Sequence, residues 1–262
     1  MSTFSPDPGD GASFRRYSAY YDLLYRDKDY PSETRFVDDQ LVRYGLPRGR
    51  LLELGCGTGR HALEFAALGW EVKGYDLSPG MVQQARHRAA ASTNRVRFEV
   101  GDIRSLRDPV RFDAAVSLFH VMSYQTTETE FCQAVETASV HLKSGGLFFF
   151  DFWFGPAVLS DPPVAREKRL TDDRTSIVRY AVPVHDLLAH TVQVNYEILS
   201  TVIASGETYR FTEKHLLRYF DLLELAVWLN GAGLGILESG RWMERKPAGA
   251  DSWYAWIIAR KT

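Results

Sequence analysis

The chain has 262 residues, of which 45% are hydrophobic, with a formal net charge of −2 and two cysteines. That length suits one large domain, and the near balance of charge gives no electrostatic reason to expect nucleic acid or a membrane as a partner. Two cysteines do not make a disulfide framework, so we expect the protein to reside in a reducing cytoplasm. The most apolar stretch, residues 146–159, is interrupted by Asp151 and is too short to span a bilayer.

The beginning of the chain is predicted to be a tail followed by a helix. Residues 1–13 have no basic start and no apolar run, which is unlike a signal peptide and predicts a disordered tail. Residues 14–47 have a helical pattern, and Gly45 and Pro47 are typical of its end.

Strand and helix signals then alternate over the next hundred residues. Strands are predicted at 51–54, 71–75, 96–100, 113–119 and 147–153, and helices at 60–68, 78–90 and 128–142. Ser78 and Pro79 are typical of a helix N-cap and first turn. This alternation predicts an α/β fold: a doubly wound, mostly parallel sheet covered on both faces.

After residue 154 the hydrophobic period changes to that of strands. Segments 176–184, 191–202 and 208–220 are β-rich and separated by turn signals, which predicts an antiparallel β insertion over 155–215. A helix at 222–232 and strands at 234–239 and 253–259 return the chain to a core made of residues 14–154 and 216–262. The insertion is expected to wall an acceptor pocket or to form a homodimer interface.

A glycine-rich turn, residues 53–59, lies at the first strand-to-helix junction. Glycines there let the backbone approach a ligand closely, and the helix N-terminus adds hydrogen-bond donors. Dinucleotide-binding folds carry G-x-G-x-x-G at this junction, whereas here the third glycine comes one place early and position 60 is Arg. Alone, the turn is compatible with several nucleotide ligands or with a purely structural role.

Acidic residues end the next two predicted strands. Asp76 follows the second strand and can accept both hydroxyls of a ribose, and Asp102 follows the third and can reach an adenine edge. Both lie at the carboxyl ends of parallel strands, where open α/β sheets bind ligands. Each can also be read as a cap of a turn or helix.

In this order, residues 53–59, Asp76 and Asp102 resemble motifs I, II and III of class I S-adenosylmethionine-dependent methyltransferases. The resemblance implies S-adenosylmethionine as the cofactor and a final pair of strands that forms a reversed, hairpin-like edge. The implied cofactor-binding residues are Tyr30, Glu53, Gly55, Cys56, Gly57, Thr58, Gly59, Asp76, Leu77, Met81, Asp102, Ile103 and Leu118.

A narrower resemblance involves residues 21–25, 28–30, 117–119 and 215–220. They are similar to the N,N-dimethyltransferases of nucleotide-linked 3-amino-deoxysugars. This implies a small-molecule acceptor, with Tyr25 beside the acceptor and Tyr30 beside the cofactor. The chain departs from those enzymes in a longer insertion and in His120, where they have a small polar residue.

The acceptor atom and the catalytic residues stay open at this point. A hydroxyl acceptor needs a general base, for which His120 and His215 are candidates, whereas an amine needs only to lose its ammonium proton. Either histidine can instead be structural, and the tyrosines can simply pack on the core. An NAD(P) oxidoreductase and a non-catalytic cofactor-binding protein are the alternative functions. No His/Cys/Asp cluster has metal-ligand spacing, so no metal is expected.

Overall fold

The computed structural model describes residues 21, 23–90 and 95–262. The predicted tail at 1–13, and the first residues of the predicted helix at 14–47, lie outside this part of the chain. Within it the predicted helix is interrupted, because a turn at 25–27 separates helical residues 21, 23 and 24 from helix α2 (Tyr30–Arg43). Asp29 caps α2 by accepting a hydrogen bond from the Ser32 amide, and Pro31 occupies its first turn, so the chain before Tyr30 turns instead.

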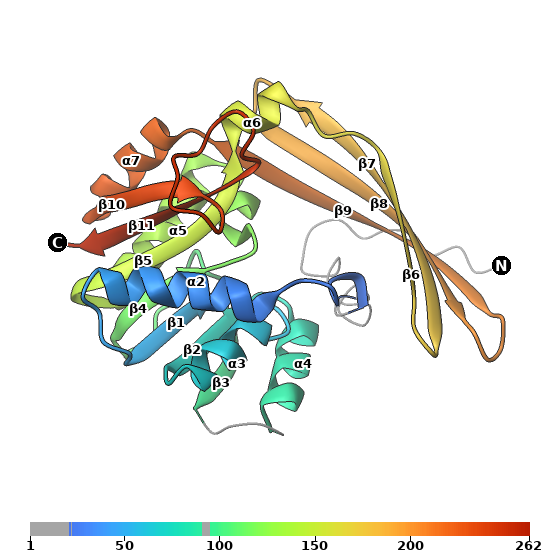
Figure 1. The fold of residues 1–262 in the computed structure, drawn as a ribbon, viewed down its shortest axis with the longest axis horizontal. Helices are drawn as coiled ribbons and strands as arrows, with labels where there is room; N and C mark the ends of the chain where they lie inside the picture. Colours follow the sequence, from blue (N-terminus) through green and yellow to red (C-terminus); the bar gives the residue numbers. More distant parts are fainter. Residues whose placement is uncertain (1–20, 22, 91–94) are drawn as a thin grey trace.

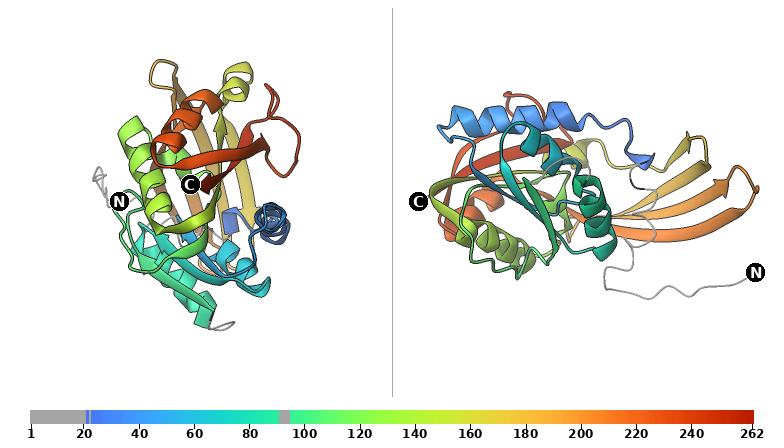
Figure 2. Two further views of the ribbon diagram at one scale, coloured as in Figure 1. Left: turned by 90° about the vertical axis from the view of Figure 1, so that its left-hand side faces the viewer. Right: turned by 90° about the horizontal axis from the view of Figure 1, so that it is seen from below.

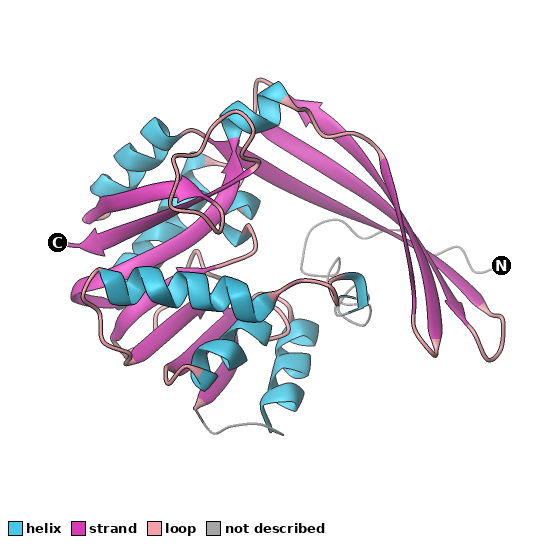
Figure 3. Ribbon diagram, in the orientation of Figure 1, coloured by secondary structure: helices cyan, strands magenta, loops and turns pink. Residues whose placement is uncertain are grey.

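Five parallel strands form the core sheet in the order β3-β2-β1-β4-β5. Their bounds are β1 Arg50–Leu54, β2 Glu71–Asp76, β3 Val96–Val100, β4 Phe112–Ser117 and β5 Leu142–Phe154. The connections contain helices α3 (Arg60–Ala67), α4 (Pro79–Ala90) and α5 (Glu128–His141), and the short 3₁₀ helix η1 (Val121–Tyr124). Helices cover both faces of the sheet, which confirms the predicted doubly wound fold (Figure 3).

The chain closes the sheet with two reversed strands. After α7 (Leu222–Gly231), β10 (Leu234–Arg241) pairs antiparallel with β11 (Tyr254–Lys261), and β11 pairs antiparallel with β5. The predicted hairpin-like edge is thus confirmed.

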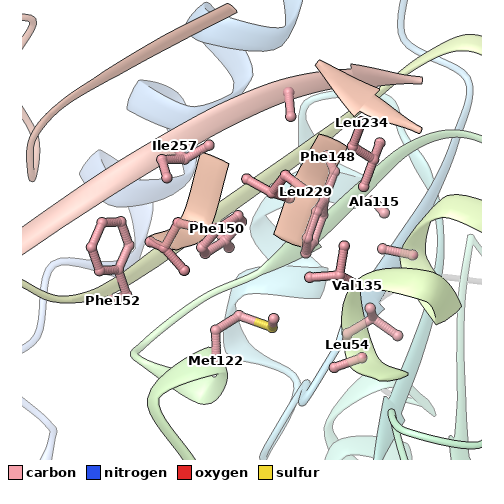
Figure 4. Close-up of a cluster of buried hydrophobic side chains, with 14 of the residues drawn as sticks. Leu54, Ala115, Met122, Val135, Phe148, Phe150, Phe152, Leu229, Leu234 and Ile257 are labelled. Carbon is pink, nitrogen blue, oxygen red and sulfur yellow. The ribbon is translucent and has the colours of Figure 1, made fainter. Parts of the chain in front are cut away.

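Alternate residues of β5 fill the two layers of the core. Phe148, Phe150 and Phe152 pack with side chains of α5 and α7 on one face (Figure 4). Leu147 and Phe149 pack with α2, α3 and α4 on the other face. Because β5 is buried on both faces, its apolar residues run almost without interruption, as expected for a central strand.

The insertion is a long antiparallel sheet, which we call the arm sheet. It follows α6 (Gly155–Ser160) and contains β6 (Arg166–Thr171), β7 (Thr175–Asp186), β8 (Thr191–Val202) and β9 (Thr208–Phe220). It extends away from the core in Figure 1 and in the right-hand view of Figure 2. The end of β9 pairs with the end of β5, so the arm sheet continues the core sheet, and β9 passes through residue 216, where the core was predicted to resume.

Candidate active site

A cavity of about 800 Å³ lies along the carboxyl ends of the core strands and against the arm sheet. Its wall follows the sheet order from Asp102 after β3, through the glycine-rich turn after β1 and His120 after β4, to Arg179 on β7. His120 therefore lies between the glycine-rich turn and the arm sheet. All the residues predicted for the site line this cavity except Glu53 and Gly59.

The three glycines of the turn all have left-handed backbone conformations, but for different spatial reasons. A Cβ on Gly57 (φ +53°) would meet no atom of the described residues within 4 Å, and Gly57 lines the cavity. A Cβ on Gly55 would lie 2.5 Å from Val121, and one on Gly59 would lie 2.5 Å from Phe98. Gly55 and Gly59 thus allow the side chains of Val121 and Phe98 to pack closely against the turn. Gly57 leaves space in the cavity.

Asp76 holds the turn in place. Its Oδ2 accepts a hydrogen bond from the Gly57 amide and its Oδ1 one from the Ser78 amide, both at 2.8 Å. Burial raises the pKa of the Asp76 carboxyl. A carboxylate has about four lone-pair positions. Asp76 can therefore cap the turn and still accept hydrogen bonds from a ligand in the cavity.

Asp102 is paired with a cation that the sequence analysis did not identify. The Arg104 guanidinium donates to both of its carboxylate oxygens, at 2.7 Å from Nη2 and 3.0 Å from Nε, and lowers the pKa of Asp102. Beside it in the cavity wall are Ile103 and Leu77, and the Leu77 side chain is 51% exposed. This end of the cavity thus combines an apolar surface with a hydrogen-bond acceptor.

Glu53 lies behind the turn rather than in the cavity. Burial, and next the negative charge of Asp76, raise the pKa of Glu53 to about 8. Within the described residues its Oε2 has no hydrogen-bond partner. Of the other predicted cofactor residues, Cys56, Thr58, Met81 and Leu118 are buried side chains at the cavity wall. Burial raises the pKa of the Cys56 thiol, which disfavours the thiolate form that a reactive cysteine needs.

The two predicted tyrosines lie at the cavity with different partners. The buried Tyr30 ring packs 4.7 Å from the ring of His61, and the Arg60 guanidinium lies 4.2 Å from its centre. Tyr25 packs edge-on to Phe119, with ring centres 4.9 Å apart, and its hydroxyl is 3.5 Å from Arg179 of the arm sheet.

His120 is held in a strained position by a buried carboxylate. Phe119 (φ +66°) and His120 (φ +61°) are consecutive non-glycine residues in the left-handed region, where such residues are uncommon. The His120 amide donates to the Asp151 carboxylate, with both oxygens at 3.2 Å. Nδ1 of His120 lies 2.7 Å from Asp151 Oδ2, which is an ion-pair distance without hydrogen-bond geometry. Its ring stacks on Tyr254 at 4.4 Å between centres. Strain maintained by such contacts is typical of functional sites.

His215 reaches the cavity with both ring nitrogens already engaged. Its Nδ1 is 2.8 Å from the Tyr124 hydroxyl, and its Nε2 is 3.1 Å from Glu213 Oε2. Tyr124 also lines the cavity. His215 therefore contacts any ligand near Tyr124 largely through that tyrosine.

The arm sheet supplies the remaining wall. Arg166 and Arg179 bring positive charge, and the Arg179 guanidinium lies 4.8 Å from the Tyr196 ring centre. Apolar and aromatic side chains also line this end of the cavity. They come from the arm sheet (Ala181, Pro183, Val194 and Leu217), from β5 (Trp153) and from the loop before β11 (Trp253). This end of the cavity suits an acceptor with an anionic group and a flat or sugar-like part.

Two features are absent from the part of the chain that the structure describes. No helix there is long and apolar enough to cross a membrane. No group of three or more His, Cys, Asp or Glu residues that could hold a metal ion occurs in the same part of the chain.

Comparisons with known proteins identify the family. Residues 51–146 match the methyltransferase domain family. The dTDP-3-amino-3,4,6-trideoxy-alpha-D-glucopyranose N,N-dimethyltransferase of Streptomyces venezuelae is 33% identical over 84% of this chain and 91% of its own length. The chain belongs to the S-adenosylmethionine-dependent methyltransferases. This assignment as an enzyme replaces the oxidoreductase and non-catalytic alternatives.

Other members of the methyltransferase family match over most of the chain as well. The dTDP-4-amino-2,3,4,6-tetradeoxy-D-glucose N,N-dimethyltransferase of Saccharopolyspora spinosa is 28% identical over 89% of this chain and 87% of its own length. The structure of a sugar N-methyltransferase from Streptoalloteichus superimposes with a TM-score of 0.81 at 20% identity, covering 100% of this chain and 96% of that one. The structural match confirms the methyltransferase fold, arm sheet included.

Proposed function

We propose that this enzyme transfers methyl groups from S-adenosylmethionine to the amino group of a nucleotide-linked amino sugar. The observation that carries the proposal is the continuous cavity, with a nucleotide-type turn at one end, His120 in the middle and two arginines at the other. The names of both relatives given above specify dTDP-linked amino sugars as their acceptors. The free thiols Cys56 and Cys132 suit a reducing compartment such as the cytoplasm.

The residues of the glycine-rich turn and its neighbours fit the methyl donor. Gly57 leaves room for it, since a Cβ there would project into open space. In our proposal Asp76 accepts hydrogen bonds from the ribose hydroxyls, and Asp102 accepts one from the adenine amino group. The exposed Leu77 and the neighbouring Ile103 flank the adenine ring, which gives their apolar surfaces a partner.

The arm sheet fits the acceptor, so we propose that it walls the pocket. Arg166 and Arg179 offer charge-assisted hydrogen bonds to a diphosphate, an anion that guanidinium groups bind well. The aromatic side chains of Tyr196 on the arm sheet and Trp253 before β11 line the cavity, and we propose that a base or a sugar packs against them.

His120 is proposed to orient the acceptor at the point of transfer. S-adenosylmethionine supplies a methyl group on a positively charged sulfur, so the protein has mainly to position the nucleophile and exclude water. The Asp151 carboxylate lies 2.7 Å from Nδ1 of His120, and the ring stacks on Tyr254. In our proposal the other ring nitrogen, Nε2, forms the hydrogen bond to the acceptor.

The same histidine supports one alternative, methylation of a sugar or natural-product hydroxyl. A histidine beside a buried carboxylate is suited to act as a general base, which a hydroxyl needs and a free amine does not.

The two functions are separated by paired acceptors. The enzyme is incubated with S-adenosylmethionine and either dTDP-3-amino-3,4,6-trideoxyglucose or the analogue with a hydroxyl in place of the amine, and products are analysed by mass spectrometry. We expect the amino sugar to gain methyl groups and the hydroxy analogue to remain unchanged. Methylation of the hydroxy analogue alone would establish the alternative.

A further inference from the structure

A buried chain of hydrogen bonds connects the arm sheet to the cavity wall. It runs from Glu213 through His215, both on β9, to Tyr124 on η1, with contacts of 3.1 Å and 2.8 Å. Glu213 and His215 are only 5% and 4% exposed. Tyr124 and His215 both line the cavity and Glu213 does not, so these hydrogen bonds lead from a buried carboxylate to the acceptor side of the site.

The chemistry of the three groups sets the direction of the hydrogen bonds. An ionised carboxylate only accepts, so a neutral His215 ring carries its proton on Nε2 and donates it to Glu213. The unprotonated Nδ1 then accepts a hydrogen bond from the Tyr124 hydroxyl. With its proton directed at His215, the Tyr124 oxygen presents acceptor lone pairs to other donors.

The groups around these three hydrogen-bonded residues favour transfer of a proton through Tyr124. They disfavour a charged form of Tyr124. Burial is the main cause that raises the pKa of Tyr124, and Tyr25, Tyr196, Glu213 and Asp76 raise it further. The Tyr196 ring packs 5.1 Å from the ring of His215, and Arg179 lies beyond it, over Tyr196. Tyr124 therefore remains a neutral phenol that receives one proton as it gives up another.

We propose that Tyr124, His215 and Glu213 form a proton relay that deprotonates the ammonium form of the acceptor. The proposal rests on the proposed amine methylation. One N–H bond of the ammonium breaks and leaves its electron pair on nitrogen, the proton joins the Tyr124 oxygen, and the Tyr124 proton moves to His215 Nδ1. The positive charge then lies on an imidazolium between Tyr124 and Glu213, and it returns to solvent as a proton after the product leaves. Tyr124 is the catalytic residue. His215 positions it and accepts the proton that it releases, and Glu213 positions His215.

The size of the expected rate increase follows from the fraction of the acceptor amine that is protonated. An amine with a pKa of about 8, as for α-amino groups, is roughly nine-tenths ammonium at pH 7 and almost wholly free above pH 9. The relay therefore increases the rate by about tenfold at pH 7 and has almost no effect at pH 9.5.

The test compares Tyr124→Phe and His215→Gln with wild type, using dTDP-3-amino-3,4,6-trideoxyglucose as the acceptor. We expect kcat to fall about tenfold at pH 7 in both variants and to recover to within about twofold of wild type at pH 9.5. Tyr219→Phe is the matched control on β9, since its buried hydroxyl has no hydrogen-bond partner within the described residues and does not line the cavity. A loss of kcat that is equal at all pH values would mean a structural role and would overturn the relay.

A second measurement does not depend on the acceptor. Nitrogen NMR of the ¹⁵N-histidine-labelled full chain reports which nitrogen of His215 carries the proton, with His215→Gln used to assign the signal. The relay requires the neutral Nε2–H form near pH 8. The Nδ1–H form would overturn the relay even if amino sugars are methylated. If no amino sugar is methylated, the proposed function fails. The NMR measurement of the His215 tautomer still tests the relay in that case.

Discussion

Gly57→Val tests the assignment of the glycine-rich turn as the cofactor site. The new side chain projects into the cavity, where a Cβ meets no atom of residues 21, 23–90 and 95–262 within 4 Å, so the expected cost to folding comes from the left-handed backbone. That conformation costs a non-glycine residue about 1–2 kcal/mol, equivalent to a Tm lower by about 2–8 °C. A branched side chain in the ligand's space should cost a further 3 kcal/mol or so, about a hundredfold in Kd.

Gly45→Val is the matched control. Gly45 (φ +82°) also has nothing within 4 Å of a Cβ, but it follows α2 and does not line the cavity. Calorimetric titration with S-adenosylhomocysteine, beside thermal unfolding, should show similar Tm losses in both variants. Weaker binding is expected in Gly57→Val alone. Normal binding by folded Gly57→Val would refute the placement of the cofactor.

Three further predictions concern carboxylates and His120. Asp76→Ala removes the acceptor of two amide hydrogen bonds and the proposed ribose ligand, so Kd for S-adenosylhomocysteine should rise at least about tenfold; an unchanged Kd would leave Asp76 as a cap only. His120→Asn should mainly raise the acceptor KM if His120 orients an amine, whereas a kcat loss of about a hundredfold or more would favour a hydroxyl acceptor and a base. For Glu53, with a pKa of about 8 when folded, the folded state retains a proton that the unfolded state loses above about pH 4.3, so the free energy of unfolding falls by up to about 1.4 kcal/mol per pH unit until about pH 8. Urea unfolding between pH 5 and pH 8 should show that Glu53→Gln removes this slope, and an unaltered slope would contradict the assignment.

Local signals predicted the core of the fold. The Ser78 cap is formed, with its hydroxyl accepting from the Met81 amide, and Gly69 ends α3 with φ +107°. The break before residue 30 was not predicted, although Asp29 and Pro31 carry ordinary helix-start signals. Strand β6 was not predicted, since its sequence Arg-Glu-Lys-Arg-Leu-Thr is that of a charged edge strand with a single buried residue.

The candidate site was predictable to the extent that its residues follow the ends of core strands. His120, Asp76 and Asp102 have such positions. Asp151 had a sequence signal, an acid inside an apolar strand, but its contact with His120 spans 31 positions and depends on the pairing of β4 with β5. The contact of Tyr124 with His215 spans 91 positions. No local pattern predicts it, because only the joining of β9 to β5 brings the arm sheet to η1.

The most direct test of the central claim is the position of the transferred methyl group. Wild-type enzyme is given S-adenosylmethionine labelled with ¹³C in the methyl group, together with dTDP-3-amino-3,4,6-trideoxyglucose, and the product is examined by carbon–proton NMR. The account predicts that the label appears as N-methyl carbon bonded to the sugar nitrogen. Label on a sugar oxygen, or no labelled sugar while S-adenosylhomocysteine still binds, would contradict it.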